Sequence, residues 1–138
     1  MKIIQVVGRS NSGKTTFIKQ LIPKLKTQGR VAVIKHLGDH EYELEEGKDT
    51  TGFFDAGADI SVGIDADKSV AAIRNNSLDS VLCLLFDQGM NFTVIEGFKG
   101  GAFPRIVIGD LDTDHSVLTN PYPEEVLASL DAFEDFYP

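Results

Sequence analysis

The stretch GRSNSGKT, residues 8–15, decides the fold of this 138-residue chain. Two glycines lie five positions apart, and a lysine and a threonine directly follow the second one. Glycine lets the backbone curl so that successive N–H groups converge on one point, and such a concave nest binds anions. The lysine adds a positive charge beside the nest. This spacing therefore predicts a loop that holds a chain of phosphates.

The sequence on either side of the loop supplies the setting that this pattern, called Walker A, requires. Residues 2–7 form a short β-branched run that predicts a buried strand. Residues 14–28 carry apolar side chains at helical spacing: Phe17, Ile18, Leu21, Ile22 and Leu25. Pro23 is expected to distort this helix and Gly29 to end it. A strand, a phosphate loop and a helix in this order predict a nucleotide site of the P-loop kind.

Further strands and helices predict an α/β protein. A second strand at residues 31–34 completes a βαβ unit, which implies a parallel sheet with helices on its faces. Other strands are predicted at residues 60–64, 69–73, 92–95 and 106–108, the first two joined as a hairpin by residues 65–67. We therefore expect a three-layer P-loop nucleoside triphosphatase fold with a mainly parallel sheet, as a single nucleotide-binding domain over residues 1–138.

Two more helices are predicted in the second half of the chain. Asn76 is placed to cap the first, whose buried face would be Leu78, Val81, Leu82, Leu85 and Phe86. Residues 81–86 alone fit a strand equally well, but the parallel pattern needs a crossover before the strand at 92–95. The second helix is predicted over residues 123–133, starting at its proline.

Composition excludes several classes of protein. No apolar run approaches the roughly 20 residues of a membrane-spanning helix, so we expect a cytoplasmic protein without a membrane partner. A formal charge of −8 would repel a phosphate backbone, which argues against a nucleic-acid partner. Cys83 is the only cysteine, so no disulfide framework or cysteine metal cluster forms within one chain, and a buried inert thiol is expected.

The phosphate loop suggests a role for each of its polar residues. Lys14 is expected at the β- and γ-phosphates, Thr15 at Mg²⁺, and Thr16 near the α-phosphate. A second carboxylate near the metal is expected at the end of another core strand, where Glu96 follows residues 92–95. Lys14 and Glu96 are thus the candidate catalytic residues, and Thr15 and Glu96 the candidate metal ligands. Glu96 would alternatively cap a helix or pair with a lysine.

The long polar segment at residues 37–57 predicts a switch or lid, because irregular loops of this length are uncommon unless they are functional. A short helical turn is expected near residues 51–56. Its acidic residues are alternative ligands for Mg²⁺ or water: Asp39, Glu43, Glu45 and Asp49.

Several segments together resemble one family. They are the phosphate loop, VIKH at residues 33–36, His40, GKDT at 47–50, AGA at 56–58 and IEGFK at 95–99. In this order they resemble the MobB family, the molybdopterin-guanine dinucleotide biosynthesis adaptor proteins, over roughly residues 2–108. Glu45 and Glu46 stand where that family usually has an aspartate, and the region from Asp110 onwards gives no clear match.

The resemblance implies a GTP-binding protein that uses Mg²⁺ and hydrolyses GTP weakly at most. It also implies a homodimer that assists a MobA-type nucleotidyltransferase, the enzyme that joins GMP to molybdopterin, and it leaves direct binding of molybdopterin open. The positions expected to bind the nucleotide or cofactor are Gly8, Ser10, Asn11, Ser12, Gly13, Lys14, Thr15, Thr16, Lys35, His36, Lys48, Asp49 and Lys99. His36 is as well explained as a hydrogen-bonded structural residue, and Asn120 as a turn residue rather than a reader of the base.

Two other functions remain open on the residues alone. A small ATP-dependent kinase would use the same loop and Mg²⁺, but it needs arginines near the phosphates, and only Arg9 is near by sequence. A non-catalytic module would use the nucleotide only to order residues 37–57 and present an interface.

Overall fold

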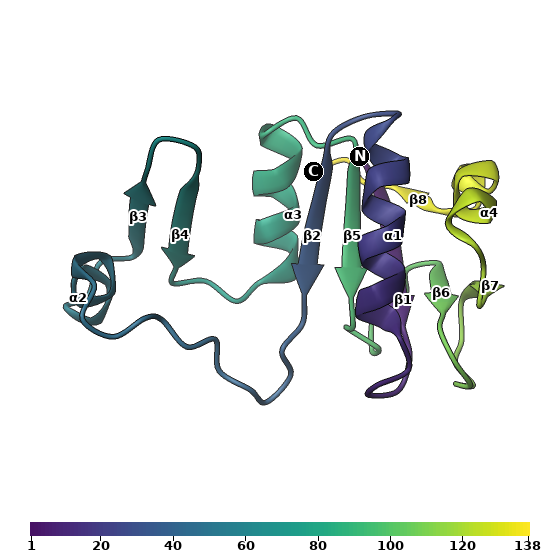
Figure 1. Cartoon of the computed structure of the whole chain (residues 1–138), viewed down its shortest axis with the longest axis horizontal. Helices are drawn as coiled ribbons and strands as arrows, with labels where there is room; N and C mark the ends of the chain where they lie inside the picture. Colours follow the sequence, from purple (N-terminus) through teal and green to yellow (C-terminus); the bar gives the residue numbers. More distant parts are fainter. The chain divides into compact units, whose positions relative to one another are not determined.

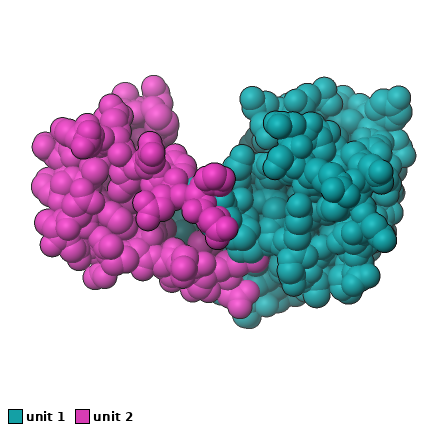
Figure 2. Space-filling model, turned by 90° about the horizontal axis from the view of Figure 1, so that it is seen from below, with its two compact units in different colours: residues 1–38, 82–138 teal, residues 39–81 magenta.

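The computed structural model describes all residues from 1 to 138, and the chain divides into two compact units (Figure 2). The first unit, here the phosphate unit, contains residues 1–38 and 82–138. The second, the hairpin unit, contains residues 39–81. The single domain over residues 1–138 stays a prediction.

The phosphate unit is built on a six-stranded sheet whose main path has the order β2-β5-β1-β6-β7 (Figure 1). These strands are β1 (Lys2–Val7), β2 (Val31–Lys35), β5 (Phe92–Glu96), β6 (Arg105–Val107) and β7 (Ser116–Thr119), and they run parallel. The two-residue β8 (Glu134–Asp135) pairs antiparallel with the start of β1. The predicted α/β fold, with a mainly parallel sheet and the phosphate loop after the first strand, is confirmed.

Helix α1 (Lys14–Lys26) packs along this sheet and continues through Pro23 to its last turn. Its buried side chains, Phe17, Ile18, Leu21 and Leu25, meet alternate residues of β1, β5 and β6. Helix α4 (Pro123–Ala128) adds Val126 to the same cluster and contacts α1. Removing a large apolar side chain of this kind from water contributes about 1.5–3 kcal/mol. This core fixes the end of β1, and with it the position of the phosphate loop.

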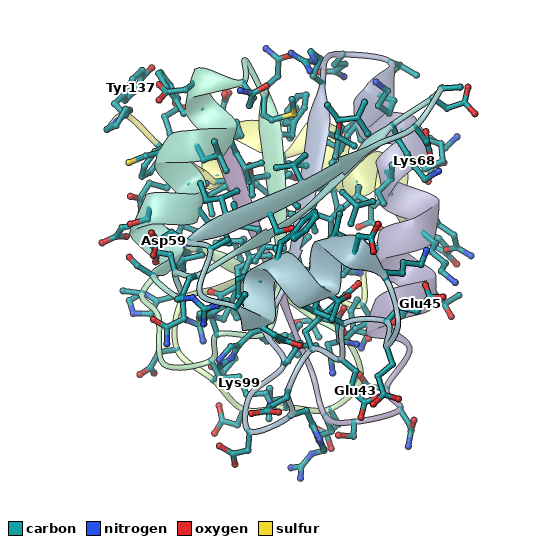
Figure 3. All side chains as sticks on the ribbon, turned by 90° about the vertical axis from the view of Figure 1, so that its left-hand side faces the viewer. Glu43, Glu45, Asp59, Lys68, Lys99 and Tyr137 are labelled. Atoms are coloured by element: carbon teal, nitrogen blue, oxygen red, sulfur yellow. The ribbon has the colours of Figure 1, made fainter.

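The hairpin unit contains α2 (Asp49–Asp55) and the antiparallel strands β3 (Ile60–Ile64) and β4 (Ser69–Ile73). The predicted strands and the turn between them are confirmed. Ser61 is its only buried residue, and its hydroxyl donates a hydrogen bond of 2.7 Å to the Thr50 carbonyl oxygen in α2. In Figure 3, Asp59 and Lys68 mark opposite ends of the hairpin. Polar contacts, more than apolar burial, connect its elements.

Helix α3 (Leu78–Asp87) runs from the hairpin unit into the phosphate unit. The predicted cap at Asn76 is wrong, because the Ser77 hydroxyl accepts the hydrogen bond from the Ser80 N–H at 3.3 Å. Of the predicted buried face only Leu82 is fully buried, and Cys83 is half-buried rather than buried. None of the four α-helices reaches the combination of length and hydropathy that crossing a membrane requires.

The carboxy-terminal helix is shorter than predicted. It starts at Pro123 as expected but ends at Ala128, because Ser129 adopts φ −120° and leaves the helical conformation. A 3₁₀ turn, η1 (Leu130–Ala132), follows, and Phe133 then enters the core ahead of β8. The sequence analysis did not predict β7 or β8.

Candidate phosphate-binding site

The phosphate loop leaves β1 through a position that only glycine fits. A Cβ atom at Gly8 would lie 2.5 Å from the carbonyl oxygen of Ile108 and 2.6 Å from the hydroxyl oxygen of Ser12. The loop therefore passes directly against the end of β6. Farther along, Asn11 and Gly13 adopt φ of 61° and 99°, in the left-handed region. These turns bring the chain back to the start of α1.

The start of α1 has no side-chain cap. The N-cap residue is Gly13, which has no side chain to bond the first N–H groups of the helix, and the first turn contains no acidic residue. The first N–H groups of a helix lack intrahelical acceptors, and they carry a partial positive charge. Thr15 and Thr16 lie exposed in this turn. The arrangement offers free N–H and hydroxyl groups to an anion.

Lys14 turns back over the loop that precedes it. Its ammonium donates hydrogen bonds to the carbonyl oxygens of Gly8 at 2.9 Å and Arg9 at 3.0 Å, and it pairs with no carboxylate. The exposed Arg9 donates to the Asp110 carbonyl oxygen at 3.0 Å. Lys14 is therefore held at the mouth of the loop by neutral acceptors.

Ser12 provides a polar atom without a partner. Its hydroxyl oxygen is buried and makes no hydrogen bond. Buried polar atoms in proteins are almost always hydrogen-bonded, so an unpaired one needs an explanation. A phosphate oxygen seated in the loop is one acceptor that would satisfy it. Ser10 and Asn11, also in the predicted set, are exposed on the same loop.

Glu96 ends β5 and lies opposite Val6 of β1 and Lys35 of β2 in the sheet register. Its side chain is 13% exposed, and its carboxylate lies 3.8 Å from the Lys35 ammonium. The structure therefore places Glu96 on the strand next to β1, two register positions before Gly8. Lys35 is brought to the same edge.

His36 follows Lys35 and contacts the segment after Glu96. Its backbone N–H donates a hydrogen bond of 2.9 Å to the Glu96 carbonyl oxygen, and its ring stacks on that of Phe98 with centroids 4.0 Å apart. Lys99, the next residue, is exposed and labelled in Figure 3. His36 therefore has structural contacts, as its alternative interpretation required.

Lys48 and Asp49 belong to the hairpin unit, where both are exposed. Lys48 pairs with Glu45 at 3.0 Å, and Asp49 starts α2, where its negative charge is favoured by the helix dipole. Within their own unit these two residues have the contacts of a solvated helix start.

Sequence reasoning missed the residues that support the loop after β5. Gln5 and Arg105 are fully buried polar side chains that hydrogen-bond to this loop. Gln5 bonds carbonyl oxygens 92 and 93 positions away, so its strand carries no local signal of this role. The partners of Arg105 lie within eight positions, but arginines are mostly exposed, and its burial follows only from the packed sheet. Asn120 is a turn residue with φ 47°, and its side-chain amide bonds both the N–H and the carbonyl oxygen of Gly109.

The residues at this edge fit a magnesium nucleotide. No group of three or more His, Cys, Asp or Glu side chains that could hold a metal ion is assembled in the chain. Mg²⁺ in nucleotide sites is typically bound by one or two carboxylates together with phosphates and water. Thr15 and Glu96 would supply the protein ligands of such an ion, which would neutralise phosphate charge.

A model of the family described as molybdopterin guanine dinucleotide synthesis protein B matches residues 3–131. The chain belongs to the MobB family. The match extends beyond residue 108, so residues 110–131, which showed no clear resemblance by sequence segments, are part of the MobB region.

Relatives of known description agree with this membership. A putative molybdopterin-guanine dinucleotide biosynthesis adapter protein of Methanocaldococcus jannaschii is 33% identical over 86% of this chain and 54% of its own length. A probable adapter protein of Bacillus subtilis is 39% identical over 77% of this chain and 64% of its own length. The MobB chain described here thus spans between about half and two thirds of these relatives.

The fold is also that of a solved MobB. The crystal structure of Bacillus subtilis MobB superposes with a TM-score of 0.74 at 28% identity, covering 97% of this chain and 99% of that one.

Proposed function

We propose that this MobB-family chain is a GTP-binding accessory protein of molybdopterin guanine dinucleotide biosynthesis, which assists a MobA-type guanylyltransferase in the cytoplasm. It binds GTP with Mg²⁺ and hydrolyses it slowly at most. The relatives named as adapter proteins of this pathway support the biosynthetic role and imply a partner enzyme. The choice of guanine over adenine rests on the family, because the Asn120 amide is already bonded to Gly109.

The observation that carries the proposal is the phosphate loop. Gly8 leaves no room for a side chain, the buried Ser12 hydroxyl is unpaired, and α1 starts without a cap. The Lys14 ammonium, held only by two carbonyl oxygens, exchanges these for phosphate oxygens without breaking an ion pair. Together these features form a site for a polyphosphate.

Slow hydrolysis is supported by the arginines of the phosphate unit. Efficient phosphoryl transfer often depends on an arginine that stabilises the transition state. Arg105 is buried against carbonyl oxygens of the loop after β5, and Arg9 bonds the Asp110 carbonyl oxygen. Arg105 is therefore committed to that loop, and Arg9 is the one arginine that could exchange a carbonyl acceptor for phosphate. Rapid turnover therefore requires the complex with a partner.

Self-association is supported by the hairpin unit. Ile60, Val62 and Ile64 alternate with Ser61 and Gly63 and are 58%, 49% and 80% exposed. This apolar strand face carries no charge, whereas the chain as a whole carries −8. Two copies meet with the least repulsion through such a neutral face. We propose that it packs against a second copy, and Val62→Lys should then shift the mass measured by light scattering from dimer to monomer. An unchanged mass would remove this face from the interface.

Calorimetric titration with GTP and ATP, each with and without Mg²⁺, tests the nucleotide site. We expect Mg²⁺-dependent binding with GTP preferred. Lys14→Ala should weaken it by at least about a hundredfold, because two charged hydrogen bonds of about 1.5–3 kcal/mol each are lost. Lys19→Ala, an exposed lysine of the same helix, is the matched control. Equal affinity of both variants would refute the phosphate assignment, and preference for ATP would favour the kinase.

Glu96→Gln tests the metal side of the same site. The amide keeps the size of the carboxylate but removes its charge, so nucleotide binding should persist. Mg²⁺-dependent hydrolysis, followed by phosphate release with and without the partner enzyme, should fall about tenfold or more, in the range of other electrostatic contributions to catalysis. An unchanged rate would return Glu96 to a structural role.

A further inference from the structure

The loop after β5 has two consecutive residues with left-handed backbone conformations. Gly97 and Phe98, which directly follow Glu96, both adopt left-handed conformations with φ of 95° and 55°. Phe98 carries a bulky side chain, for which positive φ is rare. Strained backbone persists only where the surrounding structure determines it, and it clusters at functional sites.

Gln5 contacts both Gly97 and the strained Phe98. Its side-chain amide donates hydrogen bonds of 2.7 Å to the carbonyl oxygens of both Gly97 and Phe98. Gln5 is fully buried in the middle of β1, and its side-chain oxygen has no partner. A buried amide in a central strand is costly unless it is bonded, so its donor group serves the loop.

Arg105 holds the next part of the same loop. Its guanidinium donates to the carbonyl oxygens of Lys99, at 2.9 Å, and of Gly101, and to the Thr113 hydroxyl at 3.1 Å. The residue is 1% exposed and pairs with no carboxylate. A buried charge must stay hydrogen-bonded, so the guanidinium and the loop carbonyls keep each other in place.

The two side chains act from adjacent positions. Gln5 and Arg105 are register partners across β1 and β6, so their side chains leave the sheet on the same face. Between them they bond the carbonyl oxygens of Gly97, Phe98, Lys99 and Gly101. The His36 ring closes on Phe98 as well. The loop is fixed at its base, while Lys99 and Gly100 stay exposed at its tip.

We propose that Gln5 and Arg105 are positioning residues, a buried polar clamp that fixes the loop after β5 and thereby holds Glu96 and Lys99 at the phosphate edge. The conformation of the loop is a property of the fold. The effect on hydrolysis rests on the proposed function.

The first arm of the test needs no nucleotide. The chain has three histidines, and the ring stacked on Phe98 gives the His36 proton resonances a ring-current shift. Gln5→Met removes the amide donor at similar size, and we expect the His36 resonances to move toward those of Phe98→Leu. Thr93→Val, at a fully buried polar residue of β5 that donates to Met1 instead of the loop, is the control and should leave them in place. Unmoved resonances in Gln5→Met would overturn the clamp.

The second arm measures function. With GTP and Mg²⁺, Gln5→Met should leave the dissociation constant within about threefold, because the phosphate loop is untouched, and lower the single-turnover hydrolysis rate as Glu96→Gln does. Arg105→Lys should give His36 resonances and a hydrolysis rate between those of Gln5→Met and the unmodified protein. If Arg105→Lys does not fold, Gln5→Met decides alone. Displaced His36 resonances with unchanged hydrolysis would refute the positioning role. A protein that binds no nucleotide would refute the proposed function, while the resonances still decide the clamp.

Discussion

The two units of this chain are stabilised by different means. Every buried apolar side chain lies in the phosphate unit, on strands and helices that cover each other. The hairpin unit buries one residue, Ser61, and leaves Ile60, Val62 and Ile64 open to water. Two strands and one short helix do not bury enough apolar surface to be stable alone. The difference shows that only the phosphate unit has a packed core that can hold side chains of a binding site in fixed positions.

This contrast matches the division of the predicted site residues. The phosphate loop, Lys35, His36, Glu96 and Lys99 lie on the well-packed unit. Lys48 and Asp49 lie on the weakly packed one, where local opening costs less free energy. A unit of this kind suits a switch or a protein contact better than a preorganised site.

Truncating one large apolar side chain in each unit tests most directly whether only the phosphate unit depends on apolar burial. Leu21→Ala empties a fully buried position of α1 and should lower the free energy of unfolding by about 2–5 kcal/mol. Val70→Ala, at a β4 residue that is 65% exposed and pairs with Gly63 on the face away from Ile64, should change it by less than about 0.5 kcal/mol. Urea denaturation followed by circular dichroism measures both. Comparable losses would mean that the hairpin is packed in solution.

The same glycine-to-alanine change should have opposite effects in the two units. At Gly8 the new Cβ would lie 2.5 Å from a backbone oxygen, so Gly8→Ala should destabilise by about 1–3 kcal/mol and weaken phosphate binding. At Gly52, inside α2, the Cβ meets nothing, and Gly52→Ala should stabilise that helix by about 0.5–1 kcal/mol.

Amide hydrogen exchange resolves these glycine effects unit by unit. Protection of the α2 amides should rise in Gly52→Ala, and protection of β1 should fall in Gly8→Ala. A neutral Gly8→Ala variant would contradict the close approach of the loop to β6.

Local patterns predicted most of the fold and the centre of the site. The phosphate loop, the strand before it and the helix after it are read within about 25 residues, because glycine spacing and helical periodicity are local properties. The hairpin turn at residues 65–67 carried its own signal for the same reason. Glu96 was found from its place at the end of an apolar strand.

The rest depends on contacts between distant residues. The insertion of β5 between β1 and β2 follows from sheet pairing, which a linear pattern does not encode. Helix α4 ends early at Ser129, and Phe133 beyond it packs in a core formed with distant residues of β1 and α1. Gln5 has partners up to 93 positions away, so nothing near it in the sequence indicates its role. The partners of Arg105 lie within eight positions, but its burial depends on the packing of distant strands.

The smallest expected effect concerns the turn of the hairpin, which is stabilised by the carboxylate of Asp65 instead of by buried apolar side chains. Asp65 accepts hydrogen bonds from the N–H groups of Asp67 and Lys68, each at 2.8 Å, and pairs with the Lys68 ammonium at 2.6 Å. The Lys68 ammonium first, and these N–H groups next, lower the pKa of the Asp65 carboxyl below its ordinary 3.8. A lowered folded pKa means that the stabilisation is present above pH 3.8 and is lost as the pH falls through the folded value.

We therefore expect the amide resonances of Asp67 and Lys68 to titrate with a midpoint below 3.8. Lys68→Ala should raise this midpoint toward 3.8, and Asp65→Asn, which keeps an acceptor oxygen but no titrating group, should abolish it. Because the side chain is exposed, solvent screens the pair and the gain in stability is small. Equal midpoints with and without Lys68 would show that the ion pair does not form in solution. The turn would then depend on its backbone hydrogen bonds alone, and the hairpin unit would be even less constrained relative to the phosphate unit.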